Sequence, residues 1–121
     1  MGITNRDSRR VRTAVQLAFG GVDHDLLYGE AHTLDLSLSG CRAICQSPPP
    51  VGTKLQVSLY LPGMECSISI ERAVVRWARN GRIGIQFCSM PARHREQLRY
   101  WILQAPYGRS LDVREACLMA S

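Results

Sequence analysis

The sequence predicts an all-β domain with a C-terminal helix, arranged as a six-stranded antiparallel β-barrel that the helix closes at one opening. Apolar residues alternate with polar ones in several runs, and turn-forming residues separate these runs. Helical spacing of apolar residues appears only after residue 90. The length of 121 residues fits one domain, and we find no internal repeat or domain boundary.

The alternating runs define the expected strands, which cover residues 11–19, 30–36, 41–46, 53–61, 66–77 and 83–87. Gly20-Gly21 ends the first strand, and a tight turn over residues 37–40 joins the second to the third. Three consecutive prolines make residues 48–50 a stiff loop, since proline cannot donate to a sheet. Asn80-Gly81 is the strongest hairpin signal in the chain.

The helix is expected from about Pro91 to Gln104, with Ser89 as its N-cap and its end before Pro106. Leu98 and Trp101 belong to its apolar face. Residues 105–121 form either a second short helix or a loose tail, and the sequence does not decide between them.

The N-terminal segment, residues 1–10, lacks periodicity and is expected to be a flexible lead-in to the barrel of residues 11–104. Four of the fifteen basic residues lie between Arg6 and Arg12, and the net charge of the chain is +5. Such a cluster favours a phosphate-bearing partner, although a solvated basic arm would have the same composition.

Several classes of protein are disfavoured. No apolar stretch approaches the roughly 20 residues of a membrane span, and no secretory signal is visible, so a cytoplasmic location is expected. The five cysteines form no CxxC pair and the three histidines are scattered, which predicts neither a metal site nor a disulfide framework. We find no nucleophile with a base beside it and no phosphate-binding glycine loop, so an enzyme is not expected.

Five features of the sequence occur together: an RxxxR motif before the first strand, a DxSxxG motif after the second, the strand end Ala73-Val74-Val75-Arg76-Trp77, the strand Gly-Arg-Ile-Gly-Ile-Gln-Phe and the amphipathic helix. In this combination they resemble the bacterial PilZ domain over residues 6–104. The resemblance implies a six-stranded barrel that binds the second messenger cyclic di-GMP and acts as a receptor. No cofactor is expected beside this ligand.

The resemblance also implies which residues bind cyclic di-GMP: Arg6, Arg10, Asp35, Ser37 and Gly40, with Arg9 and Trp77 as further candidates. A guanidinium forks onto a phosphate or onto the O6/N7 edge of guanine. The carboxylate of Asp35 would accept hydrogen bonds from guanine N1–H and N2–H₂. Ser37 would bond the ligand or hold the turn, and Gly40 would serve the backbone through φ > 0 or a close approach. Trp77 is either a stacking platform or a packed tryptophan.

Two other functions stay open at this point. The first is a PilZ-like protein-interaction module that does not bind nucleotide, although both ligand motifs are intact here. The second is a nucleic-acid-binding barrel, which we do not expect because aromatic residues are few. A receptor without an output domain would act on an unidentified downstream protein. The sequence does not give the oligomeric state.

Overall fold

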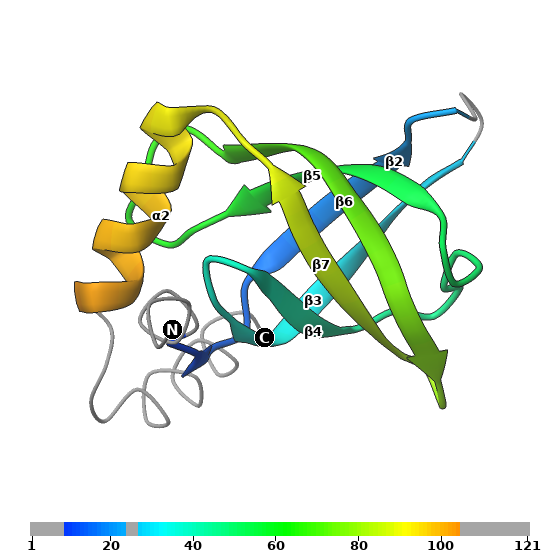
Figure 1. The fold of residues 1–121 in the computed structure, drawn as a ribbon. Coiled ribbons are helices and arrows are strands. Elements are labelled where there is room, and N and C mark those ends of the chain that lie inside the picture. Colours follow the sequence, from blue (N-terminus) through cyan, green and yellow to red (C-terminus); the bar gives the residue numbers. More distant parts are fainter. Residues whose placement is uncertain (1–8, 24–26, 105–121) are drawn as a thin grey trace, which may run out of the picture.

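The computed structural model describes residues 9–23 and 27–104 (Figure 1). Within them, the strands are β1 (Val11–Arg12), β2 (Gln16–Gly21), β3 (Tyr28–Leu36), β4 (Gly40–Ile44), β5 (Lys54–Tyr60), β6 (Ile68–Arg79) and β7 (Arg82–Ser89), and the helix is α2 (Ala92–Gln104). Neighbouring strands follow the order β3-β2-β5-β6-β7-β4, and pairing of β3 with β4 closes the ring. The predicted six-stranded antiparallel barrel with a C-terminal helix is therefore confirmed.

The first predicted strand is wrong in one respect, because the chain breaks at Thr13–Val15 and forms two strands. The cause is Thr33 of β3. Its hydroxyl accepts a hydrogen bond from Val15 N–H at 2.8 Å and donates one to Thr13 C=O at 2.5 Å. Its N–H donates to Val15 C=O at 2.9 Å. The Thr33 side chain therefore replaces backbone hydrogen bonds between the strands at this point. The two-residue strand β1, which precedes the break, pairs with β3.

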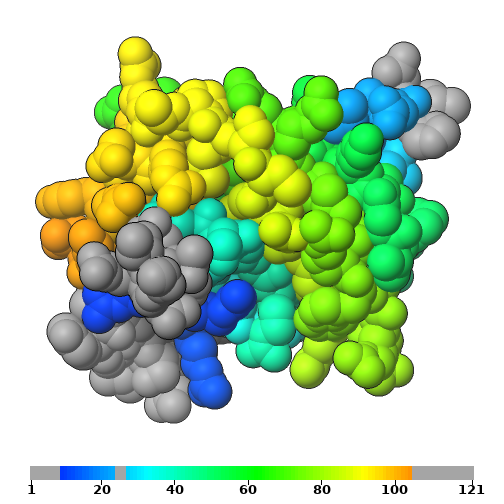
Figure 2. Space-filling model, in the orientation of Figure 1, coloured from blue at the N-terminus to red at the C-terminus, as the bar shows by residue number. Residues whose placement is uncertain are grey.

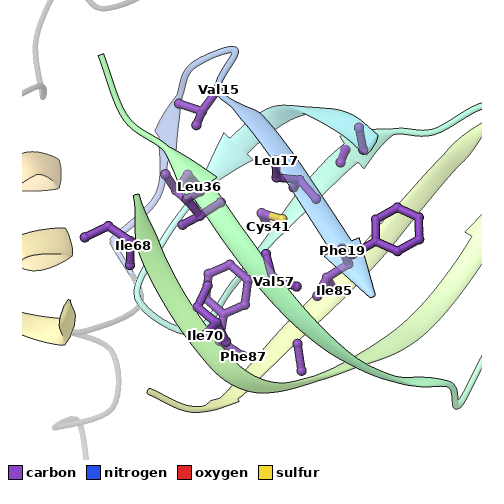
Figure 3. Close-up of a cluster of buried hydrophobic side chains, with 14 of the residues drawn as sticks. Val15, Leu17, Phe19, Leu36, Cys41, Val57, Ile68, Ile70, Ile85 and Phe87 are labelled. Carbon is purple, nitrogen blue, oxygen red and sulfur yellow. The ribbon is translucent and has the colours of Figure 1, made fainter. Parts of the chain in front are cut away.

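Apolar side chains from all six barrel strands fill the interior (Figure 3). Leu17, Leu36, Leu59 and Ile83 are completely buried, and each fully buried side chain of this kind contributes about 1.5–3 kcal/mol to folding. Cys41 also lies in this core. The barrel is thus a solid scaffold, and sites for other molecules must lie on its outer surface.

Helix α2 covers one opening of the barrel with the buried side chains of Leu98 and Ile102 (Figure 1). Trp101 packs beside the core, and its indole N–H donates to Pro62 C=O at 3.1 Å. Ser89 is not the helix cap that we predicted. It ends β7, and its hydroxyl lies 3.1 Å from a carboxylate oxygen of Glu71. No helix in the described ranges is long and apolar enough to cross a membrane.

The β6–β7 hairpin forms at Asn80-Gly81, as predicted. Both residues have positive φ, 54° at Asn80 and 75° at Gly81, which is the conformation of a type I′ turn. The turn fixes the register, in which Arg79 is directly opposite Arg82. The hairpin projects away from α2 (Figure 1).

Candidate functional site

The short strand β1 brings an N-terminal arginine to the β3–β4 turn. Val11 pairs with Leu36, and both are buried, so Arg10 lies at the surface beside the end of β3. Arg10 Nη1 is 2.6 Å from Asp35 Oδ1, across a sequence separation of 25 residues. Two segments that the sequence singled out separately are therefore in direct contact.

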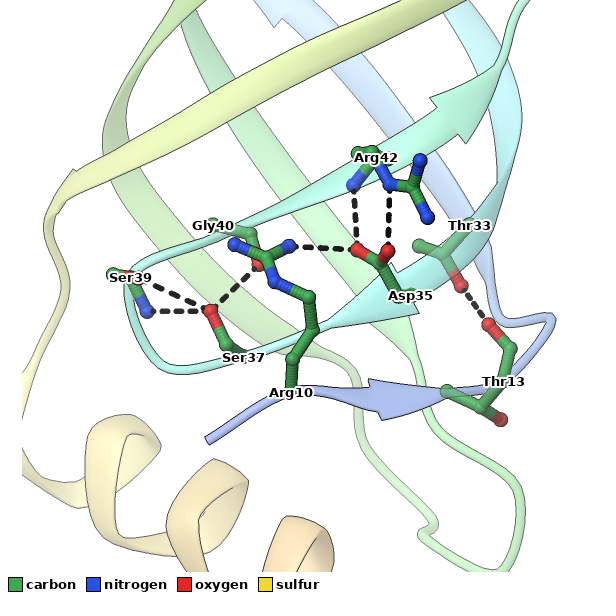
Figure 4. Close-up of polar contacts among 8 residues, drawn as sticks. All are labelled: Arg10, Thr13, Thr33, Asp35, Ser37, Ser39, Gly40 and Arg42. Carbon is green, nitrogen blue, oxygen red and sulfur yellow. Dashed lines mark hydrogen bonds and ion pairs between the residues drawn. The ribbon is translucent and has the colours of Figure 1, made fainter. Parts of the chain in front are cut away.

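Asp35 binds a second arginine as well (Figure 4). Arg42 Nε lies 2.6 Å from Asp35 Oδ2, and the backbone N–H of Arg42 donates to Oδ1 at 3.3 Å. The Asp35 side chain is only 4% exposed, whereas Arg10 and Arg42 are 44% and 49% exposed. Charge-assisted hydrogen bonds of this kind compensate for burial of the carboxylate. We call Arg10, Asp35 and Arg42 the Asp35 cluster; its net charge is +1.

The turn after Asp35 is held by its own side chains. The buried Ser37 hydroxyl donates to Gly40 C=O at 3.2 Å and accepts a hydrogen bond from Ser39 N–H at 3.2 Å (Figure 4). A Cβ atom on Gly40 would lie 2.3 Å from the carbonyl oxygen of Ile85. Ser37 thus holds the turn, and Gly40 is needed for close approach to β7 rather than for a positive φ.

A bulge in β6 turns two neighbouring side chains outward. The register with β7 shifts between Val75 and Trp77, so Arg76 and Trp77 both face the same surface hollow. The indole lies over Gly84, where an added Cβ would be 2.1 Å from Trp77 Nε1. The guanidinium carbon of Arg79 is 5.7 Å from the centroid of the Trp77 ring. Trp77 is therefore half-buried, with Gly84 of β7 against its indole and the guanidinium of Arg79 over its ring, and it forms part of the wall of the hollow.

These elements surround a surface hollow of about 600 Å³, which we call the central hollow. Its lining residues are Arg10, Asp35, Ser39, Gly40, Cys41, Arg42, Arg76, Trp77, Gly84, Ile85 and Gln86. Of the predicted site residues, Arg10, Asp35, Gly40 and Trp77 meet here. Ser37 supports the turn from beneath, Arg9 is exposed outside the lining, and Arg6 lies outside the described residues.

Cys41 is a buried part of this wall. Burial, together with the negative charge of Asp35 and partly opposed by Arg10, raises the pKa of its thiol to about 12. The thiol is therefore protonated at neutral pH and not a nucleophile. Within residues 9–23 and 27–104, no three His, Cys, Asp or Glu side chains gather to hold a metal ion.

Sequence reasoning did not select Arg42, Arg76 or Gln86 as ligand-binding residues. The position of Arg42 could have been predicted, because a four-residue turn over residues 37–40 places position 35 opposite position 42 in an antiparallel pair. The outward direction of Arg76 could not have been predicted from the sequence, since it depends on the bulge in β6. Arg76 also donates a cross-strand hydrogen bond to the side-chain oxygen of Gln86.

A comparison with protein families gives a match to the PilZ domain over residues 4–104. The chain belongs to the PilZ domain family. This confirms the resemblance on which the site residues were chosen. PilZ domains are ligand-binding and adaptor modules. A search among curated proteins finds no match.

Solved structures with the same fold include three that cover most of this PilZ domain. The PilZ domain of CeSA from a cellulose-synthesizing bacterium has a TM-score of 0.65 at 17% identity, covering 80% of this chain and 97% of that one. The PilZ domain of *Escherichia coli* YcgR with c-di-GMP has a TM-score of 0.61 at 18% identity, covering 93% and 95%. *Bacillus subtilis* MotI/DgrA, an inhibitor of motility, has a TM-score of 0.67 at 18% identity, covering 86% of this chain and 53% of that one. At these identities the likeness shows a shared fold.

Proposed function

We propose that this PilZ domain binds cyclic di-GMP in the central hollow and acts as a receptor or adaptor rather than as an enzyme. The observation that carries the proposal is the Asp35 cluster, which holds two half-exposed arginines beside Trp77 at the hollow. Membership of the PilZ family supports it, as does the c-di-GMP in the structure of the YcgR domain.

The arginines supply the chemistry that an anionic, guanine-bearing ligand needs. Cyclic di-GMP carries two phosphates and two guanines, and a guanidinium fork fits either group. Among the described residues, Arg10 bonds Asp35 through Nη1 alone, and Arg6 lies one RxxxR step before it in the sequence. Binding of both arginines would order the N-terminal segment against the barrel, where Arg10 already contacts Asp35, and change the surface offered to a downstream protein.

Asp35 was expected to accept hydrogen bonds from a guanine, but in this proposal its main role is to hold two arginines. Both of its oxygens already accept hydrogen bonds from arginines, so it positions Arg10 and Arg42 for the ligand. A guanine edge would reach Asp35 only by replacing one of these donors. A guanine on Trp77 would take the place of Arg79 over the ring, and such a stack contributes about 1–3 kcal/mol.

The test is titration calorimetry of the full chain with cyclic di-GMP, using cyclic di-AMP and GTP as controls. We expect only cyclic di-GMP to bind, with affinity at least tenfold lower in Arg10→Ala. Arg72→Ala is the matched control, because Arg72 is exposed on β6 outside the hollow, and its affinity should stay within twofold of the native value. Absence of both heat and chemical-shift changes would replace the proposal with a PilZ-like interaction module that binds no nucleotide.

A further inference from the structure

A second hollow, of about 520 Å³, lies beside the central one at the base of the β6–β7 hairpin. Its lining residues are Arg42, Trp77, Arg79, Asn80 and Arg82, and it shares Arg42 and Trp77 with the central hollow. The space-filling view shows the hairpin at the lower right of the molecule (Figure 2). We call this second site the hairpin hollow. Three of its five lining residues are cationic and none is acidic.

The strand register concentrates these cations. Arg79 is directly opposite Arg82 across the hairpin, and Arg82 is opposite Ile44, two residues along β4 from Arg42. Like charges directly opposite each other destabilise a strand pair. Among the described residues, no carboxylate is paired with Arg79 or Arg82. Within this part of the chain, Arg79 contacts the Trp77 ring but no negative charge offsets the repulsion between the two arginines, and an external anion would.

We propose that the hairpin hollow docks an acidic segment of a partner protein. Arginine binds a carboxylate through two parallel hydrogen bonds. Arg79 and Arg82 are both exposed, and both line the hairpin hollow. Exposed charge also speeds association with a complementary partner. A run of Glu or Asp side chains matches this lining, because each carboxylate can take one guanidinium.

The aromatic geometry favours a protein over a nucleic acid. Sites for single-stranded nucleic acids stack bases on open aromatic faces. Trp77 is the one aromatic residue among the described residues that line this hollow. Gly84 lies against its indole, and the guanidinium of Arg79 lies over the ring. A base would therefore have to displace Arg79 from the ring, as the guanine of cyclic di-GMP would, whereas carboxylates need no open aromatic face.

The shared lining predicts that cyclic di-GMP weakens docking of the acidic segment. The ligand would bring two negative charges to Arg42 and Trp77, which belong to both hollows. This coupling rests on the proposed function, while the docking site itself does not. It would give the receptor an output: the acidic partner is held in the free state and released when the ligand binds.

The docking site is tested by fluorescence anisotropy with fluorescein-labelled octaglutamate and the full chain. We expect Arg79→Ala/Arg82→Ala to weaken binding at least tenfold, and the charge-matched control Arg72→Ala/Arg93→Ala less than twofold, since both control residues are exposed elsewhere. Equal losses in both variants would overturn the site in favour of general charge attraction. Tighter binding of a labelled eight-nucleotide thymidylate, lost in the hairpin variant, would overturn the protein partner in favour of nucleic acid.

The coupling is tested by repeating the peptide titration with saturating cyclic di-GMP, whose own binding is followed by calorimetry. We expect at least fivefold weaker peptide binding, and a cyclic di-GMP affinity in the hairpin variant that falls by no more than threefold, since a guanine on Trp77 displaces Arg79 in any case. A larger loss there would overturn a separate site, because it would make the hairpin arginines part of the nucleotide site. If cyclic di-GMP binds and the peptide affinity does not fall, the coupling is overturned. If cyclic di-GMP does not bind, the proposed function fails and the docking result stands.

Discussion

Two groups of arginines on one side of this PilZ domain are held in opposite ways. Arg10 and Arg42 meet the buried carboxylate of Asp35, with a contact of 2.6 Å to each of its oxygens. Arg79 and Arg82 face each other at the hairpin, and the described residues give them no carboxylate. In the first group a buried acid fixes the guanidinium groups, whereas in the second only the backbone register brings them together.

This difference separates two uses of positive charge. A guanidinium that is already hydrogen-bonded loses little side-chain freedom when a ligand arrives, so the Asp35 cluster suits recognition of one defined small molecule. Exposed guanidinium groups without a carboxylate partner can bind the carboxylates of another chain in several arrangements, so the hairpin suits a variable protein segment. The two groups should therefore respond oppositely to mutation: the first should lose stability and the second should gain it.

Asp35→Ala should give the largest change. The substitution removes three hydrogen bonds from a buried carboxylate, and each bond to a charged group contributes about 1.5–3 kcal/mol. The half-exposed arginines regain water when the carboxylate is lost, so we expect the free energy of unfolding in urea to fall by the value of one such bond, roughly 1.5–3 kcal/mol. Cyclic di-GMP affinity should fall with it. Glu71→Ala is the control, since Glu71 is exposed on β6, and it should change stability by less than about 0.5 kcal/mol. An Asp35→Ala protein of native stability would contradict a structural role for the cluster.

Cys41, behind the Asp35 cluster, should make stability depend on alkaline pH. Burial raises the pKa of its thiol from 9.0 to about 12, so the folded state binds the proton more tightly than the unfolded state does. The resulting stabilisation is complete below about pH 9 and is lost as the pH rises towards 12. We expect this thiol to lower the free energy of unfolding by up to about 1.4 kcal/mol per pH unit in that range.

Urea unfolding of the native protein and of Cys41→Ala at several pH values checks this. The native protein should show the steeper decline, since the variant lacks the buried thiol. Cys88→Ala should decline as the native protein does, because Cys88 is exposed. Parallel slopes for the native protein and Cys41→Ala would rule out an effect of this thiol on the pH dependence.

The sequence predicted most of the fold because its signals are local. Alternation marked the strands, Asn80-Gly81 marked a hairpin whose two residues have positive φ, and helical spacing marked α2. It missed the break at Thr13–Val15, because that break depends on a side chain of β3, 18 to 20 residues away. Local alternation contains no information on such a contact.

The site was predicted only in part for the same reason. Motif spacing selected Arg10 and Asp35, and the structure places them in contact. The direction of Arg76 and Trp77 depends on a bulge in β6, and the cationic surface at the hairpin depends on the register of β7 with β4. Both are properties of strand pairing across the barrel. The ligand roles of Arg6, Arg9, Arg10, Asp35, Ser37, Gly40 and Trp77 stay predictions.

Arg82→Glu should give the smallest change in stability and a change of opposite sign. It replaces a like-charge pair with an opposite-charge pair opposite Arg79, so we expect the free energy of unfolding to rise by about 0.2–1 kcal/mol. Octaglutamate binding should be lost at the same time. Arg72→Glu is the matched control, because Arg72 is opposite Ser89 and not opposite another arginine, and it should leave both quantities nearly unchanged. A fall in stability in Arg82→Glu would mean that Arg82 stabilises the free domain. A rise together with lost binding would mean that the hairpin keeps its charge for a partner at the expense of its own stability.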